Sequence, residues 1–200
     1  MGETMVNHEH VIGFVAAGAA LTAFSADTAN ADPADFAGPY AGLGFGTMAG
    51  TVGDDYRYAV GDQLIGSAYA GYNWLYGDTI IGAEIGFTGS DTYNGYDVYG
   101  IEHLVDVRGR VGMSLSDNTM LFGSVGLWTA DYLFYGNDDG GRATGYSVGL
   151  GFETNMSNGM FIGGDVTMRS TSDVDLNDPG DDNKSPDHLT TATLRVGFRF

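Results

Sequence analysis

Nine charged side chains in this 200-residue chain lie inside runs where apolar residues alternate with small or polar ones. They are five of the eight basic residues and four carboxylates: Glu84, Asp106, Arg108, Arg110, Glu153, Asp165, Arg169, Arg195 and Arg199. The planar guanidinium group of arginine can hold a carboxylate through two parallel hydrogen bonds. Charges buried in a narrow interior are costly unless they are paired in this way. These residues therefore predict an internal network of ion pairs.

A stretch near the C-terminus is the second place where residue types suggest chemistry. It reads TSDVDLNDPGDDNKSPDH, and Asp173, Asp175 and Asn177 are spaced like the first ligands of a calcium-binding loop. The pattern then departs from an EF-hand, because Asp178 stands where that loop needs Gly and Lys184 where it needs Glu. We therefore expect a solvated acidic loop with these three residues as weak candidate ligands, and no cofactor.

The elements that carry these residues are predicted to be strands. From Pro39 onward there is no helical periodicity, and apolar residues recur at every second position. Most runs are long enough for a tilted strand to cross a bilayer, which takes about 9–11 residues. Eight strands are expected, at Tyr40–Gly50, Gln63–Tyr76, Thr79–Ser90, Ile101–Ser116, Thr119–Tyr135, Thr144–Met156, Met160–Ser172 and Leu189–Phe200.

Short and long connections alternate between these strands. Tight turns are expected at Gly77-Asp78, Asp117-Asn118 and Ser157-Asn158-Gly159. Bacterial outer-membrane barrels have short periplasmic turns and longer external loops, so both ends of the mature chain are placed on the periplasmic side. The longer, polar connections are Thr51–Asp62, Asp91–Gly100, Gly136–Ala143 and Thr171–His188.

The faces of the strands indicate which side meets hydrocarbon. A soluble sandwich also alternates, but it would bury the apolar face, whereas a membrane barrel turns that face outward. The polar face is rich in glycine, which suits the narrow lumen of eight strands. In Thr119–Tyr135 the alternation is irregular, which predicts an inward Trp128 and a bulge. Aromatic residues gather near strand ends as interfacial girdles do: Tyr72, Trp74, Tyr76, Phe198 and Phe200 on the turn side, and Phe87, Tyr132 and Tyr146 on the loop side.

These observations predict an all-β fold, an eight-stranded antiparallel transmembrane β-barrel with an up-and-down meander. Within it, neighbouring strands bring Glu84 toward Arg108 and Arg110, and Asp165 toward Arg195. We interpret the charged network as a structural plug that fixes the register and blocks ion flow, because eight strands leave little free lumen. A narrow charged pore and a catalytic carboxylate site are the alternatives.

The first 31 residues have the pattern of a targeting signal. An apolar, uncharged stretch, VIGFVAAGAALTAF, is too short to span a bilayer but has the length of a signal-peptide core. Ala29-Asn30-Ala31 then matches a cleavage site, so residues 1–31 are expected to be removed and the barrel domain to comprise residues 32–200. An uncleaved anchor or a buried helix is the alternative.

Composition restricts the function further. The formal net charge is −18, and nucleic-acid binding needs a basic surface, so no nucleic-acid partner is expected. The chain has no cysteine, which removes thiol-based metal, redox and nucleophile chemistry. No catalytic motif lies in a fitting context. His188, near a strand end, is the one candidate for a lipid-modifying site.

Three segments resemble opacity-type, OmpA-like outer-membrane β-barrel proteins. Pro39–Gly46 resembles the opening strand of that family, and Gly71–Trp74 with Ile81–Glu84 resembles its hairpin with an inward acidic residue. Arg195–Phe200 is similar to the closing strand, which ends in an aromatic residue. The resemblance covers residues 39–200. It implies secretion, folding by the barrel-assembly machinery with Phe198 and Phe200 as the signal, and contact with outer-membrane lipid and lipopolysaccharide.

The resulting hypothesis is a non-enzymatic surface or structural protein of a Gram-negative outer membrane. Its lumen is expected to be salt-bridged and largely closed, and its acidic external loops are expected to carry any contact with external ligands or host surfaces. A small pore or solute conduit is the alternative, followed by a lipid-modifying envelope enzyme.

Overall fold

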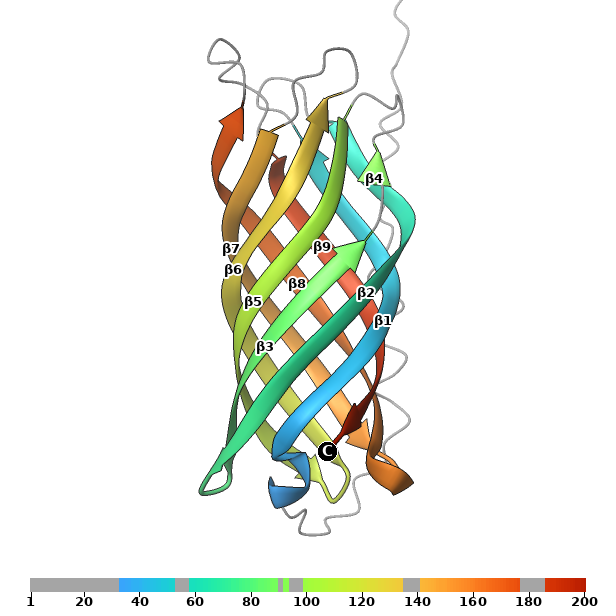
Figure 1. Ribbon diagram of the computed structural model, residues 1–200, viewed down its shortest axis with the longest axis vertical. Coiled ribbons are helices and arrows are strands. Elements are labelled where there is room, and N and C mark those ends of the chain that lie inside the picture. Colours follow the sequence, from blue (N-terminus) through green and yellow to red (C-terminus); the bar gives the residue numbers. More distant parts are fainter. Residues whose placement is uncertain (1–32, 53–57, 90–91, 94–98, 135–140, 177–185) are drawn as a thin grey trace, which may run out of the picture.

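The alternating segments form long antiparallel strands in the computed structural model, which describes residues 33–52, 58–89, 92–93, 99–134, 141–176 and 186–200 (Figure 1). Residues 1–31, the expected targeting signal, lie outside the described residues. A short 3-10 helix, η2 (Pro33–Phe36), precedes the first strand. The strands are β1 (Gly38–Val52), β2 (Tyr58–Tyr76), β3 (Thr79–Gly89), β4 (Thr92–Tyr93), β5 (Tyr99–Ser116), β6 (Thr119–Phe134), β7 (Gly141–Asn155), β8 (Met160–Leu176) and β9 (Pro186–Arg199).

Each long strand pairs antiparallel with its neighbours, and the sheet closes on itself. β1 pairs with β9, and β3 pairs with β5, so the eight long strands leave no free edge between them. The pairing of β3 with β5 ends at Leu104, and the two-residue β4 then pairs with Ile101 and Gly100 of β5. The predicted eight-stranded up-and-down barrel is therefore confirmed, and a two-sheet sandwich is excluded.

The three tight connections lie at one end of the barrel. Tyr76 pairs with Thr79 and Ser116 with Thr119, which leaves the two-residue turns that the sequence predicts. The third is the 3-10 turn η3 (Ser157–Gly159), where Asn158 has a φ of 77°. η2 and the C-terminus lie at this same end (Figure 1). By the rule for outer-membrane barrels, this is the periplasmic end.

At the other end the strands continue into segments that were expected to be loops. β2 begins at Tyr58 within the expected loop Thr51–Asp62, β8 runs on to Leu176, and β9 begins at Pro186. β2 thus has 19 residues, about 8–10 more than the roughly 9–11 that a tilted strand needs to cross a bilayer.

The expected irregularity near Trp128 is a bulge in the neighbouring strand. Between β5 and β6, Glu102 pairs with Asp131 but Val105 pairs with Thr129, so β5 contains one extra residue. His103 lies in this bulge with a φ of 49°. The bulge shifts the phase of β5 by one residue, which brings both Ile101 and Leu104 into the buried interior.

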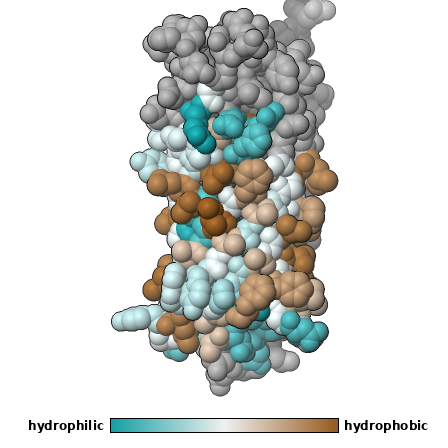
Figure 2. Space-filling model, viewed as in Figure 1, coloured by the Kyte–Doolittle hydropathy of each residue, from teal (hydrophilic) through white to brown (hydrophobic). Residues whose placement is uncertain are grey.

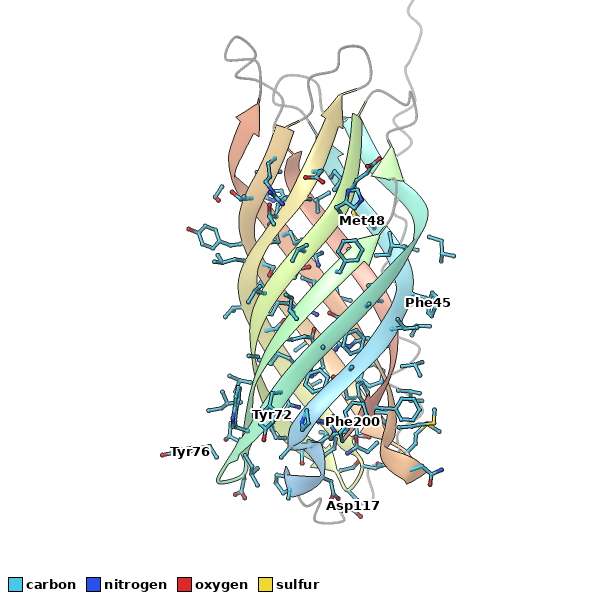
Figure 3. The ribbon with its side chains drawn as sticks, viewed as in Figure 1. Phe45, Met48, Tyr72, Tyr76, Asp117 and Phe200 are labelled. Atoms are coloured by element: carbon cyan, nitrogen blue, oxygen red, sulfur yellow. The ribbon has the colours of Figure 1, made fainter. Side chains whose placement is uncertain are left out.

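The outer wall is apolar over its middle. Figure 2 shows apolar side chains gathered there on the visible side, with hydrophilic ones toward both ends. Phe45 points away from the barrel, whereas Met48, three residues on, lies within it (Figure 3). Large apolar side chains are exposed on every long strand, including Leu43, Phe45, Trp74, Ile85, Val107, Val111, Val125, Leu127, Val148, Leu150, Met168, Leu194 and Phe198.

No helix among the residues that the structure describes is both long and apolar enough to cross a membrane.

Side chains fill the lumen in three layers. The loop-side layer is apolar and includes Trp128, which is buried as expected; its members are Met48, Ile65, Ile101, Leu104, Trp128, Ala130, Ala143 and Leu189. The charged residues occupy the middle. The turn-side layer consists of two aromatic and aliphatic clusters, Phe36, Ile80, Met120 and Phe122 together with Tyr40, Tyr69 and Phe161.

Candidate functional site

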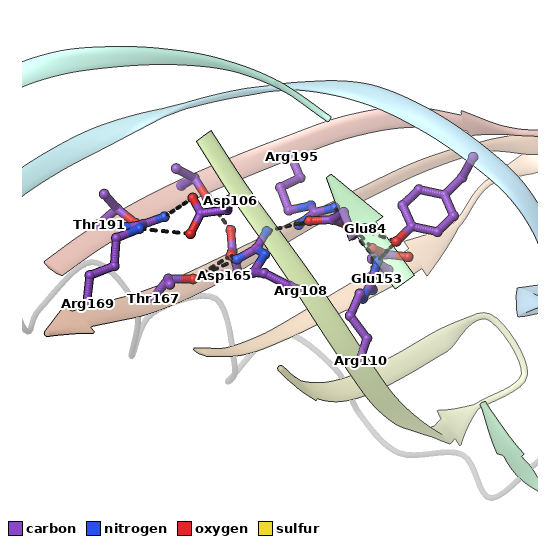
Figure 4. Close-up of polar contacts among 12 residues, drawn as sticks. Glu84, Asp106, Arg108, Arg110, Glu153, Asp165, Thr167, Arg169, Thr191 and Arg195 are labelled. Carbon is purple, nitrogen blue, oxygen red and sulfur yellow. Dashed lines mark hydrogen bonds and ion pairs between the residues drawn. The ribbon is translucent and has the colours of Figure 1, made fainter. Parts of the chain in front are cut away.

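The charged residues occupy inward positions of the long strands. These strands are five in number: Glu84 is on β3, Asp106 to Arg110 on β5, and the others on β7, β8 and β9, so the network spans the lumen (Figure 4). Strand register sets the first pair, because Glu84 lies directly opposite Arg108. All nine side chains are at most 8% exposed. Each charge therefore depends on protein groups for its solvation.

Glu84 is the centre of the network, since three guanidinium groups and a phenol donate to it. Arg195 donates to both carboxylate oxygens, at 2.5 and 3.1 Å, and Arg110 donates to Oε2 at 3.0 Å. Arg108 donates to Oε1, and the hydroxyl of Tyr40 donates to Oε2 at 2.9 Å. A single fully buried carboxylate of β3 thus joins residues of three other strands, β1, β5 and β9.

Glu153 extends the network toward the periplasmic end. It accepts hydrogen bonds from Arg110 at 2.7 Å and from Arg199 at 2.9 Å, and Nη2 of Arg195 lies 3.6 Å away. Arg110 therefore bridges Glu153 and Glu84. These bonds tie β5, β7 and β9 together across the lumen, where no backbone pairing connects β5 to β9.

Two aspartates hold the loop-side part of the network. Asp106 receives two hydrogen bonds from Arg169, from Nε at 3.1 Å and from Nη2 at 2.7 Å. Asp165 accepts from Arg108 at 2.9 Å and from the hydroxyls of Thr167, at 3.0 Å, and Thr193. The carboxylates are satisfied by cations and hydroxyl groups together, as a buried charge requires.

One expected pair is not formed. Asp165 was expected to meet Arg195, but it pairs with Arg108, whereas Arg195 pairs with Glu84. The register explains the difference: Asp165 lies opposite Thr193, and Arg195 lies opposite Gly163. The arginine side chain is long enough to cross the lumen to a strand that is not its neighbour.

Aromatic rings cover the guanidinium groups from the turn side. The Cζ atom of Arg110 lies 3.8 Å from the ring centre of Phe122, and that of Arg195 lies 3.8 Å from the ring centre of Tyr69. Arg199 lies 5.3 Å from the ring centre of Phe161. Such cation–π contacts add to the stabilisation of desolvated charges.

Below these rings, Phe36 of η2 closes the periplasmic mouth, a feature that the sequence reasoning missed. The Phe36 side chain is fully buried against Ile80, Met120 and Phe122. Its carbonyl oxygen accepts hydrogen bonds from Asn73 at 2.9 Å and from Arg199 at 2.5 Å. The available signal was the apolar Phe36 between the expected cleavage site and the first strand.

The other candidate residues lie away from this network. Asp173 and Asp175 belong to the paired backbone of β8, opposite Thr144 and Arg142, while Asn177 lies outside the described residues. The part of the chain that is described contains no group of three or more His, Asp or Glu side chains arranged to hold a metal ion.

Both histidines of the strands lie near the loop end. His188 is exposed on β9, where its backbone pairs with Ser170. His103 is exposed on the outer wall, and its Nδ1 lies 3.1 Å from a carboxylate oxygen of Asp131. Neither faces the charged network.

The free space inside the network is small. A cavity of about 30 Å³ lies between the Asp106–Arg169 pair and the Arg108–Arg195 region. That volume suits one or two water-sized occupants. With apolar layers on both sides, the arrangement can hold strands in register and obstruct ion passage.

Comparison with known proteins identifies the family of this barrel. The model of the family described as outer membrane protein beta-barrel domain matches residues 16–200. A "22 kDa outer membrane protein" of Rhizobium leguminosarum bv. viciae is 30% identical over 175 residues, which cover 80% of this chain and 75% of that protein.

Solved structures share the fold at low sequence identity. Neisserial surface protein A matches with a TM-score of 0.56 and 10% identity, covering 81% of this chain and 97% of that one. Ail, the attachment invasion locus protein of Yersinia pestis, matches with a TM-score of 0.53 and 16% identity over 82% and 99% of the two chains. Ail has also been solved in complex with the heparin analogue sucrose octasulfate.

Proposed function

Because this chain belongs to the outer membrane protein beta-barrel domain family, whose members are barrels of the bacterial outer membrane, we propose that it is a non-enzymatic surface and structural protein. Its barrel anchors the protein in the membrane, its lumen is closed, and its external loops make the contacts.

The observation that carries the proposal is the continuous filling of the lumen. Apolar side chains close the loop-side end, paired charges fill the middle, and Phe36 with its neighbours closes the periplasmic mouth. A conduit needs a connected aqueous path, and eight strands leave an interior that side chains fill. A cavity of about 30 Å³ does not supply such a path.

Single-channel recording in planar bilayers tests the closed lumen. The refolded barrel is expected to insert without steps of stable conductance. A barrel of the same fold with a known open channel, measured in parallel, confirms that insertion is detectable. Stable, uniform openings of the native protein would instead support the pore alternative and refute the closed lumen.

External contacts are proposed for the loops at the end opposite the periplasmic turns. Ail, a relative in fold, has been solved with a sulfated heparin analogue. The loop-side part of this chain is instead acidic, with six aspartates in residues 171–188, so cationic ligands or host surfaces are favoured. Binding of cells that display the protein to polylysine and to heparin surfaces compares the two; preference for heparin would contradict this assignment.

Export and assembly follow from the same proposal. We expect cleavage after Ala31, insertion by the barrel-assembly machinery, and contact with outer-membrane lipid and lipopolysaccharide. Phe198 and Phe200 are exposed on the outer wall at the end of the last strand, where an assembly partner can bind them. Deletion of Phe200 is expected to reduce the folded, heat-modifiable band on unboiled gels several-fold; an unchanged band would exclude its role as the assembly signal.

A further inference from the structure

The cavity in the charged network exists because one inward position has no side chain. Gly86 of β3 lies between Tyr69 of β2 and Asp106 of β5 in the register, and it lines the cavity. A Cβ atom added at Gly86 would meet no atom within 4 Å. At other lumen-facing glycines, such as Gly71 and Gly126, a Cβ atom would collide with neighbours. The space at Gly86 is therefore open, whereas the space at those glycines is occupied.

The groups around this space are mainly hydrogen-bond donors. Arg108, Arg169 and Arg195 line the cavity against two carboxylates, those of Asp106 and Asp165. The Nε–H groups of Arg108 and Arg195 are buried and have no hydrogen-bond partner among the described residues. Hydroxyl groups of Ser67, Thr88, Thr191 and Thr193 belong to the same lining. An occupant that accepts hydrogen bonds would satisfy these donors.

The net charge of the network also favours an anion. Its described members are five arginines and four carboxylates, so one positive charge is in excess, and every one of these side chains is at most 8% exposed. An uncompensated buried charge is costly where water is scarce. The apolar layers above and below keep bulk water away from it.

We propose that the cavity beside Gly86 binds a small monovalent anion of halide size, with chloride as the abundant example. The anion accepts hydrogen bonds from the free arginine Nε–H groups and from the hydroxyls of Thr88 and Thr191, and it neutralises the excess charge. A cavity of about 30 Å³ admits such an ion, and the carboxylates of Asp106 and Asp165 in its lining disfavour a more highly charged anion such as sulfate. The site is a structural one, so it is independent of the loops and of any external partner.

Crystallography with bromide gives the direct test. Crystals of the full barrel grown in sodium bromide are expected to show one anomalous peak in the lumen, beside Arg108 and Arg195. Density for water alone at this position, with no anomalous signal, would overturn the proposal.

Unfolding in two salts gives the second test. At equal ionic strength, the midpoint temperature of the native protein is expected to be about 2–4 °C higher in sodium chloride than in sodium gluconate, because gluconate is too large to enter. Gly86→Ala fills the space and is expected to abolish that difference.

Gly66→Ala is the matched control for this substitution. Gly66 is also open to an added Cβ atom, but it belongs to the outward positions of β2, so its variant should keep the chloride effect. Equal chloride effects in all three proteins, or none in the native one, would overturn the anion site. Both variants are first checked for the heat-modifiable folded band.

Discussion

The two faces of β5 follow opposite rules although they share one backbone. Val107 and Val111 are 57% and 59% exposed, whereas Arg108 and Arg110 are 7% and 3% exposed. In a water-soluble protein the exposures would be reversed. Outside this barrel the solvent is hydrocarbon, and inside it every polar group must find a protein partner.

Because of this contrast, a substitution on the inner face and one on the outer face destabilise the barrel for different reasons. On the inner face a side chain is held by particular partners, so its removal leaves those partners unsatisfied. On the outer face a side chain meets lipid alone, so its polarity matters more than its shape. The following changes separate these two causes.

The largest effect is expected on the inner face, from Glu84→Ala. The substitution leaves Arg108, Arg110 and Arg195 without their shared carboxylate, and breaking a buried ion pair in this way costs about 3–5 kcal/mol. Urea unfolding in liposomes should show this loss as a much lower midpoint. Glu84→Gln, which keeps one acceptor oxygen but loses the charge and the second acceptor, should lie between, and Asp78→Ala in an exposed turn should change little. A native-like midpoint for Glu84→Ala would show that the network does not stabilise the barrel.

The next largest effect is expected on the outer face, from Val125→Arg. Val125 is 66% exposed on the apolar wall of β6, and arginine at the bilayer midplane destabilises a barrel by about 2–4 kcal/mol. The same unfolding assay measures it. Asp117→Arg places an arginine at the exposed turn end instead (Figure 3) and should be nearly neutral. If both variants lost the same stability, the outer wall would not face hydrocarbon.

A smaller effect is expected at the periplasmic mouth, from Asn73→Ala. It removes one of the two hydrogen bonds to the carbonyl oxygen of Phe36, and a typical bond of this kind contributes about 1 kcal/mol. Faster hydrogen exchange in residues 33–37, with the rest of the barrel unchanged, is the expected signature. Asn118→Ala, in an exposed turn, is the control. Unaltered exchange in this segment would mean that Asn73 does not hold the closure.

The sequence predicts the wall of this protein well because a period of two is a local signal. The exposed Leu194, Val196 and Phe198 and the buried Arg195 follow directly from it. The inward position of Trp128 also follows, although the bulge that accompanies it belongs to β5 and not to its own strand.

The interior is predicted less completely because alternation assigns a face but not a partner. The register places Glu84 opposite Arg108, but the contact of Arg195 with Glu84 crosses the lumen between strands that are not paired. The apolar layers at both ends were missed for a similar reason. Met48 and Ile65 are apolar, so polarity alone gives no reason to place them inside a membrane barrel, yet both are buried.

The seam between β1 and β9 joins the beginning and the end of the described barrel. The amide of Phe200 donates to the carbonyl oxygen of Pro39 at 2.9 Å, and the preceding Arg199 donates to the carbonyl oxygen of Phe36. Closure of the sheet and closure of the periplasmic mouth therefore both depend on the end of β9. While β9 is undocked, the sheet has an open edge, and Glu84 and Glu153 lack the guanidinium groups of Arg195 and Arg199, so an incompletely closed barrel differs from a closed one in features that a protease can recognise.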